Sequence, residues 1–111
     1  MNVYDAINNL ANEIKKSKEY TEYKQVKEQI KQNPDLKEKI KEFEKARYDT
    51  QISTMNGKEP SKEVIEKMQK IYIELIQNDI SKRYLEVELA FNTMLTDVNR
   101  ILGEAVQDVM S

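Results

Sequence analysis

Carboxylates near the end of the chain are the first candidates for chemistry. Glu86 and Glu88 stand close together, and Asp97 follows them. Two carboxylates can act as general acid and base when burial raises the pKa of one of them. On a helix, however, residues two apart point to different sides, and no glycine-rich phosphate loop or metal-ligand motif accompanies them. We expect no catalytic site, and we expect Asp97 to pair with Arg100 or a neighbouring helix.

The composition removes most other reactive groups. The 111 residues include no cysteine and no histidine. Disulfides, thiolate-bound metals and thiol nucleophiles are therefore excluded, as are the commonest general base and transition-metal ligand. We expect a protein that is not an enzyme and has neither cofactor nor metal. An enzyme with an all-carboxylate metal site is the weakest alternative.

A basic stretch from Lys15 to Arg47 offers a different function. It holds eleven basic and seven acidic residues, with Tyr20 and Tyr23 among them. Lysines that bind phosphate and tyrosines that stack on bases would make a nucleic-acid-binding accessory protein. The interspersed acids and a whole-chain pI of about 5.3 favour a solvated, self-paired face instead. Nucleic-acid binding is thus the alternative function.

Acidic residues dominate the other end of the chain. Residues 84–111 hold five acidic residues and one basic residue, whereas the whole chain has a net charge of -2. Such an asymmetry can polarise the molecule and steer a partner toward it.

Apolar residues recur at helical spacing along most of the chain, and sustained strand alternation is absent. Strong breakers occur only around Asn33-Pro34 and between Asn56 and Ser61. Asn78 and Asp79 predict either a kink or a fresh helix cap. The expected helices cover about residues 3–16, 18–32, 34–56, 62–76 and 79–109.

The last expected helix has the most regular pattern. Its apolar residues alternate steps of four and three, which is typical of a coiled-coil seam. Unbroken, residues 79–109 would span roughly 46 Å at 1.5 Å per residue, whereas a compact domain of this size is about 34 Å across. The helix must therefore bend, for example near Gly103, or find cover on another copy. The seam comprises Ile80, Tyr84, Val87, Phe91, Met94, Val98, Ile101 and Ala105.

These patterns predict one all-α domain over residues 1–111, a bundle of about five helices with helical hairpin packing and a long C-terminal helix. We expect self-association, with a homodimer as first choice, and a further protein partner is compatible with the same faces. The chain has no run of ~20 apolar residues and no basic N-terminal patch before an apolar run, so we expect no membrane contact and a cytoplasmic location. The candidate interface comprises Tyr84, Val87, Phe91, Met94, Leu95, Val98, Ile101 and Leu102.

Short sequence stretches throughout the chain carry a family resemblance. They begin with Asn2-Val3-Tyr4-Asp5 and Glu19-Tyr20 and continue with Met55-Asn56-Gly57-Lys58-Glu59-Pro60 in the central turn. Asn78, Ile80 and Asp97-Val98-Asn99-Arg100-Ile101-Leu102 follow. With these, the whole chain resembles the YlbF/YheA-like family of small bacterial all-helical proteins, and it is most similar to the YheA-type branch.

The resemblance implies an all-α fold, a bacterial cytoplasmic setting and an oligomer. Better-known relatives act as non-enzymatic partners in regulatory complexes linked to RNA turnover, competence and biofilm formation. Family members often show Pro-Leu after the last stretch, whereas this chain has Gly103-Glu104-Ala105-Val106. We therefore expect its C-terminal tail to pack differently.

Overall fold

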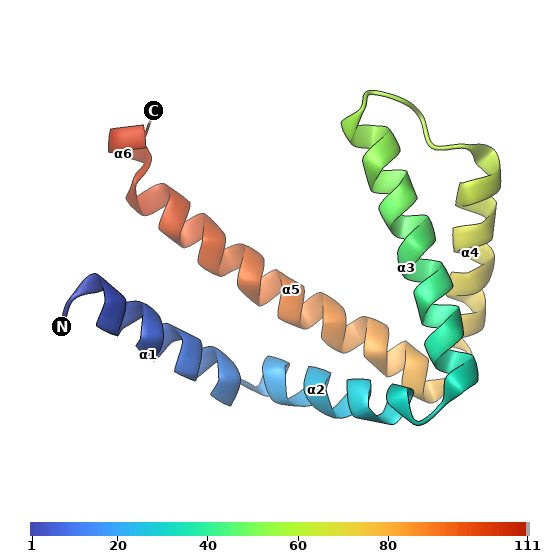
Figure 1. Ribbon diagram of the computed structural model, residues 1–111, viewed down its shortest axis with the longest axis horizontal. Coiled ribbons are helices and arrows are strands. Elements are labelled where there is room, and N and C mark those ends of the chain that lie inside the picture. The colour runs from blue at the N-terminus through green and yellow to red at the C-terminus, as the bar shows by residue number, and fades with distance from the viewer. Residues whose placement is uncertain (111) are drawn as a thin grey trace. The chain divides into compact units, whose positions relative to one another are not determined.

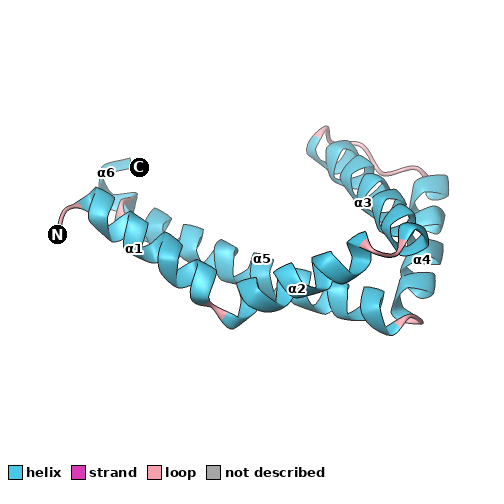
Figure 2. Cartoon of the chain, turned by 60° about the horizontal axis from the view of Figure 1, so that its bottom comes forward, coloured by secondary structure: helices cyan, strands magenta, loops and turns pink. Residues whose placement is uncertain are grey.

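The computed structural model describes residues 1–110, and all of its regular structure is helical (Figure 1). Short loops join the helices, and the described residues contain no strand (Figure 2). The all-α prediction is confirmed, with six helices in place of about five. Their bounds are α1 Val3–Lys16, α2 Lys18–Lys31, α3 Pro34–Met55, α4 Lys62–Ile76, α5 Asp79–Ala105 and α6 Gln107–Met110.

Side-chain caps set the starts of the helices. The Asn33 side chain accepts a hydrogen bond from the Leu36 amide at 3.2 Å, with Pro34 in the first turn of α3. Proline is tolerated there because the first amides of a helix have no intrahelical partner. Ser17 and Ser61 likewise accept amide hydrogen bonds at the starts of α2 and α4. Two of these caps coincide with the breaks that the sequence predicts around Asn33-Pro34 and between Asn56 and Ser61.

Gly57 ends α3 as the sequence predicts. Its φ of +73° lies in the left-handed region that favours glycine. Its amide donates to the Thr54 carbonyl, and the Lys58 amide donates to the Ser53 carbonyl. These two bonds form a Schellman motif, which satisfies carbonyls that would otherwise lack partners at the helix end.

The break at Asn78 is a fresh helix cap. The Asn78 side chain accepts hydrogen bonds from the amides of Ile80 and Ser81. The fully buried Ser81 hydroxyl donates back to the Leu75 carbonyl at 2.5 Å. The Asn78 side chain thus caps the start of α5, and the Ser81 hydroxyl bonds a carbonyl near the end of α4, so the two helices are separate elements.

The helices divide into two compact units. The hairpin unit is Lys27–Arg83, and the terminal unit is Met1–Val26 with the described residues from Tyr84 on. In the hairpin unit α3 and α4 pack against each other and bury a common core. The buried core residues of these two helices are Leu36, Ile40, Phe43, Ala46, Ile71 and Leu75. The expectation of a single domain stays a prediction.

The terminal unit contains α1, the first half of α2, most of α5 and α6. The N-terminus lies toward the same end of this unit as α6 in both ribbon views (Figures 1 and 2). α5 ends at Ala105, and a single turn at Gln107–Met110 follows. The helix over residues 79–109 is therefore interrupted three residues beyond Gly103, near where the sequence offers a bend as one alternative. Backbone pairing restarts at Val106, whose carbonyl accepts from Val109 and Met110.

Within residues 1–110, none of the helices combines the length and apolar character that crossing a lipid bilayer requires.

Candidate interaction surface

Burial along α5 decreases steadily toward its C-terminal end. Tyr84 and Val87 are buried, with 3% and 4% of their surface exposed. Four further members of the candidate interface, Phe91, Met94, Leu95 and Val98, are half-buried. Ile101 and Leu102 are exposed by 57% and 51%. One continuous seam is thus core at its start and open surface at its end.

An aromatic cluster closes the buried end of this seam. The Tyr23 ring lies 5.9 Å from that of Tyr84 and 5.3 Å from that of Phe91, between ring centroids. The Tyr20 ring lies 6.2 Å from Phe91. Tilted rings at these separations attract one another beyond the area that they bury. The first part of α2 therefore packs against α5 at Tyr84 and Phe91.

Burial along α1 also changes steadily, and it decreases toward the N-terminal end of the helix. Its apolar residues follow a helical stripe, yet no residue of α1 is buried. Ile14 and Leu10 are half-buried, whereas Ile7, Tyr4 and Val3 are exposed. An isolated helix of 14 residues is marginal in water, and most helical stability comes from packing of the apolar face. Much of this stripe lacks that packing within one chain.

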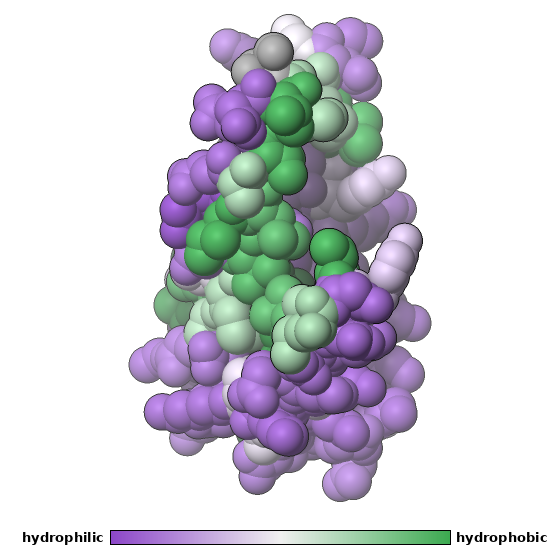
Figure 3. All heavy atoms as spheres, turned by 90° about the vertical axis from the view of Figure 1, so that its left-hand side faces the viewer, coloured by the Kyte–Doolittle hydropathy of each residue, from purple (hydrophilic) through white to green (hydrophobic). Residues whose placement is uncertain are grey.

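The exposed ends of these helices form what we call the terminal apolar surface. Its members each expose more than half of their area, and at roughly 100 Å² apiece they expose on the order of 800 Å². The largest apolar patch of a typical monomer is about 300–600 Å², and each partner in a standard interface buries about 800 Å². From the side where both termini lie, apolar residues form a band bordered by polar ones (Figure 3). The members are Met1, Val3, Tyr4, Ile7, Ile101, Leu102, Val109 and Met110.

A negatively charged edge runs beside this surface on α5. Asp97 and Glu104 are seven residues apart, so they lie on one side of the helix next to the seam. Arg100 pairs with both, at 3.8 Å to Asp97 and 3.3 Å to Glu104. The expected pairing of Asp97 with Arg100 is confirmed. Two carboxylates share one guanidinium, so this edge keeps net negative charge.

The other carboxylates of α5 are separated as expected. Glu86 is exposed, whereas Glu88 is buried and accepts a hydrogen bond from the Tyr84 hydroxyl at 3.1 Å. Among residues 1–110, no three carboxylates gather in a way that could hold a metal ion. The two glutamates therefore lie in different environments, as their spacing of two residues on a helix predicts.

Two tyrosines of the basic stretch belong to the aromatic cluster, which favours a packing role for Tyr20 and Tyr23 over base stacking. Some lysines of the stretch are ion-paired, as Lys31 is with Glu28 and Lys39 with Glu74. Nucleic-acid binding stays an untested alternative. A binding titration at two salt concentrations would test it, because phosphate contacts weaken steeply as salt rises.

The hairpin unit has a separate apolar hollow of about 400 Å³ between α3 and α4. Its lining includes Phe43, Tyr72 and Ile73, and the Phe43 and Tyr72 rings lie 6.1 Å apart. The hollow has no signature in the sequence, because its lining comes from two helices whose relative rotation no local pattern encodes.

α1 is not part of the candidate interface that the sequence predicts. The spacing of Val3, Ile7, Leu10 and Ile14 predicts the helix and its apolar face. The spacing does not predict that this apolar face is exposed at the N-terminal end of α1, because exposure depends on how far the neighbouring helices extend. Whether the predicted α5 residues contact another copy stays a prediction.

Residues 1–110 thus form a small all-helical protein whose terminal unit exposes a large apolar surface. Comparison with known proteins gives the family. Residues 3–107 match the family model described as control of competence regulator ComK, YlbF/YmcA. The chain therefore belongs to the YlbF/YmcA family, which confirms the family resemblance, and its assignment to the YheA-type branch stays a prediction.

Similar sequences include UPF0342 proteins of several bacteria. That of Symbiobacterium thermophilum is 36% identical over 94% of this chain and 93% of its own length. That of Halothermothrix orenii is 34% identical over 92% of this chain and 86% of its own length. A UPF0342 protein of Listeria monocytogenes is 27% identical over 98% of this chain and 93% of its own length. No solved structure matches the chain significantly.

Proposed function

We propose that this protein is a non-enzymatic interaction module of the bacterial cytoplasm that self-associates through the terminal apolar surface, with a homodimer as the first form. One observation carries the proposal. Burial falls in the same direction on both helices, from Tyr84 to Leu102 on α5 and from Ile14 to Val3 on α1. Two apolar stripes that are both exposed at the same end of the terminal unit form a surface on which another chain can pack.

The energetics support association of this surface. Burial of apolar area contributes roughly 25 cal/mol per Å² before the entropy of association is subtracted. The terminal apolar surface is large enough for a standard interface, and α1 gains the cover that its amphipathic stripe requires. Association would therefore stabilise α1 as well as join two chains.

Membership of the family supports a regulatory role. Its model is described by control of the competence regulator ComK, and the surface described above is suited to binding a protein. We infer that the chain acts by contact with other protein chains, in a regulatory process of the kind that the family model names.

Light scattering coupled to size exclusion at micromolar concentration tests the proposal. We expect the wild-type chain to have the mass of two chains. The double variant Ile101→Glu/Leu102→Glu should have the mass of one chain, because two charges in the centre of the surface oppose its burial. Circular dichroism should show that the double variant has the same helix content as the wild-type chain.

Leu89 provides the matched control. It lies on α5, is 69% exposed and stands on the side of the helix away from the seam. Leu89→Glu should leave the mass at two chains. A wild-type mass of one chain at all concentrations would refute the proposal, as would equal dissociation by both sets of variants.

A further inference from the structure

α1 differs from the other long helices of the described chain in having no buried residue. Each of α2, α3, α4 and α5 contains buried residues, whereas in α1 only Leu10 and Ile14 are even half-buried. Val3, Tyr4 and Ile7 expose 77%, 78% and 53% of their surface. Because most helical stability in proteins comes from packing of the apolar face, packing within one chain stabilises α1 only weakly.

The residue types of α1 do not compensate for this weak packing. Three of its 14 residues are asparagine, at Asn8, Asn9 and Asn12, and three more are β-branched. Both kinds have lower helix propensity than alanine. The Asn2 side chain accepts a hydrogen bond from the Asp5 amide, which fixes where the helix begins. A helix of this length is marginal in water even when it is rich in alanine, so α1 is marginal without a partner.

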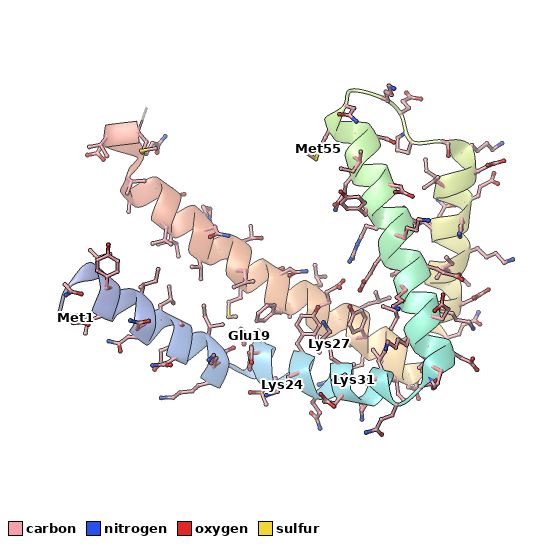
Figure 4. The ribbon with its side chains drawn as sticks, in the orientation of Figure 1. Met1, Glu19, Lys24, Lys27, Lys31 and Met55 are labelled. Atoms are coloured by element: carbon pink, nitrogen blue, oxygen red, sulfur yellow. The ribbon has the colours of Figure 1, made fainter. Side chains whose placement is uncertain are left out.

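Ser17 separates α1 from α2. Its ψ of 153° is extended, and a short loop interrupts the ribbon here, before Glu19 (Figure 4). The Ser17 hydroxyl donates to the Ile14 carbonyl at 2.6 Å and accepts from the Tyr20 amide at 3.1 Å. The Tyr20 ring is held independently, by its contact with the Phe91 ring of α5. α1 can therefore lose its helical structure while α2 keeps its place.

We propose that α1 opens and closes as a unit in the free chain, and that association of two copies holds it closed. This step rests on the self-association proposed above, in which the exposed stripe of α1 packs on a second copy. Val3, Tyr4 and Ile7 belong to the terminal apolar surface, so that surface is complete only when α1 is helical. Ordering of α1 and assembly are then one coupled equilibrium.

The outer side of α1 then controls an affinity to which it contributes no contact. When the conformation that can bind is only partly populated, the apparent affinity falls in proportion to that population. Asn8 and Asn12 are exposed and lie four positions apart on the side of α1 away from its apolar stripe. A substitution there that raises helix propensity increases the population of closed α1 and strengthens the dimer.

Hydrogen exchange of the full chain, measured by mass spectrometry over a series of concentrations, tests the opening. We expect α1 to lose its protection where light scattering gives the mass of one chain, and to be protected where it gives the mass of two. The two transitions should share one midpoint, because they report one equilibrium. Peptides around Leu75 in the hairpin core should be protected at every concentration.

Substitutions on the outer side of α1 test the coupling. Asn8→Ala/Asn12→Ala raises helix propensity at two exposed positions and removes no apolar contact. Because each dimer orders two copies of α1, we expect its dissociation constant to fall by roughly tenfold, as measured by sedimentation.

Asn92→Ala is the matched control. Asn92 is exposed on α5 next to Phe91, where contacts with the Tyr20 and Tyr23 rings already hold the helix. The same change of residue type should therefore leave the dissociation constant unchanged. An equal fall for Asn92→Ala and the α1 variant would refute the coupling.

The outcomes separate this proposal from the proposed function. If the chain dimerises while α1 is equally protected at every concentration, self-association stands and the opening of α1 is refuted. An unchanged dissociation constant for Asn8→Ala/Asn12→Ala refutes the coupling in the same way. A wild-type chain that is monomeric at every concentration refutes both proposals.

Discussion

The two units of this protein use the same kind of helix in different ways. In the hairpin unit, α3 and α4 bury a shared core, and Leu75 has no exposed surface. In the terminal unit, α1 buries no residue and the end of α5 exposes Ile101 and Leu102. Amphipathic spacing is therefore not sufficient for burial, since a stripe is buried only where another element runs beside it over its whole length.

The difference assigns different roles to the units. A hairpin whose apolar stripes meet supplies much of its own stability. A helix pair that is closed by an aromatic cluster at one end and open at the other keeps part of its apolar area for binding. Variants that affect stability should therefore concentrate in the first region, and variants that affect association should concentrate in the open end of the second.

The largest stability effect should come from Leu75→Ala in the hairpin core. Loss of a fully buried leucine leaves a cavity and should lower the free energy of unfolding by about 2–5 kcal/mol. Ile101→Ala, measured at a chain concentration that keeps copies apart, should change it by no more than about 0.5 kcal/mol. Urea denaturation followed by circular dichroism measures both values. Similar losses for the two variants would remove the distinction between the units.

A smaller effect should follow Tyr84→Phe at the closed end of the terminal unit. The Tyr84 hydroxyl donates to the buried Glu88 carboxyl group at 3.1 Å, and its removal takes a hydrogen-bond donor from a buried polar group. We expect a loss of about 1–3 kcal/mol in the same denaturation experiment. Tyr72→Phe, at a position 46% exposed on α4, is the control and should be nearly neutral. A neutral Tyr84→Phe would mean that the hydroxyl bond contributes no net stability.

Gly57→Ala should weaken the end of α3. The glycine has φ +73°, and an added Cβ disfavours this conformation by about 1–2 kcal/mol even though no other atom lies within 4 Å of it. Thermal unfolding should show a lower Tm. Gly57→Asn should lose less, because asparagine tolerates the left-handed region better than alanine. An unchanged Tm for Gly57→Ala would argue against the Schellman motif.

Gly103→Ala should have the smallest effect and the opposite sign. Gly103 lies inside α5, where an added Cβ meets no atom within 4 Å. Replacing a helical glycine by alanine should raise stability by about 0.5–1 kcal/mol. A higher Tm with unchanged mass by light scattering is the expected result. A lower Tm would indicate that the open end of α5 is less helical than the structure shows.

Much of the secondary structure could be predicted because its signals are local. Asn33-Pro34, Gly57, Ser61 and Asn78 each cap or end a helix through hydrogen bonds within a few residues. The sequence left open where the last helix is interrupted, because Val109 continues an apolar pattern past Ala105, where α5 ends. An apolar pattern indicates which side chains are favoured for burial. It does not indicate whether the backbone remains helical over the whole pattern.

The candidate site could be predicted only in part. The α5 seam was visible in the spacing of Val87, Phe91 and Met94, yet the same spacing fits a buried residue and an exposed one. The aromatic contacts of Tyr20 and Tyr23 place the first part of α2 against Phe91, and the exposure of Ile101 and Leu102 shows where the cover stops. The contribution of α1 to the open surface depends on that stopping point, so no local signal could reveal it.

The sequence by itself determined the helical class, the caps, the absence of cysteine and histidine chemistry, and the family likeness. These depend on residue types and on spacings of a few positions, which act through local hydrogen bonds and side-chain chemistry. Only the tertiary structure decided which apolar stripes are covered. Burial depends on which helices of one unit lie side by side and on how far each extends, and those distances join residues far apart in the chain.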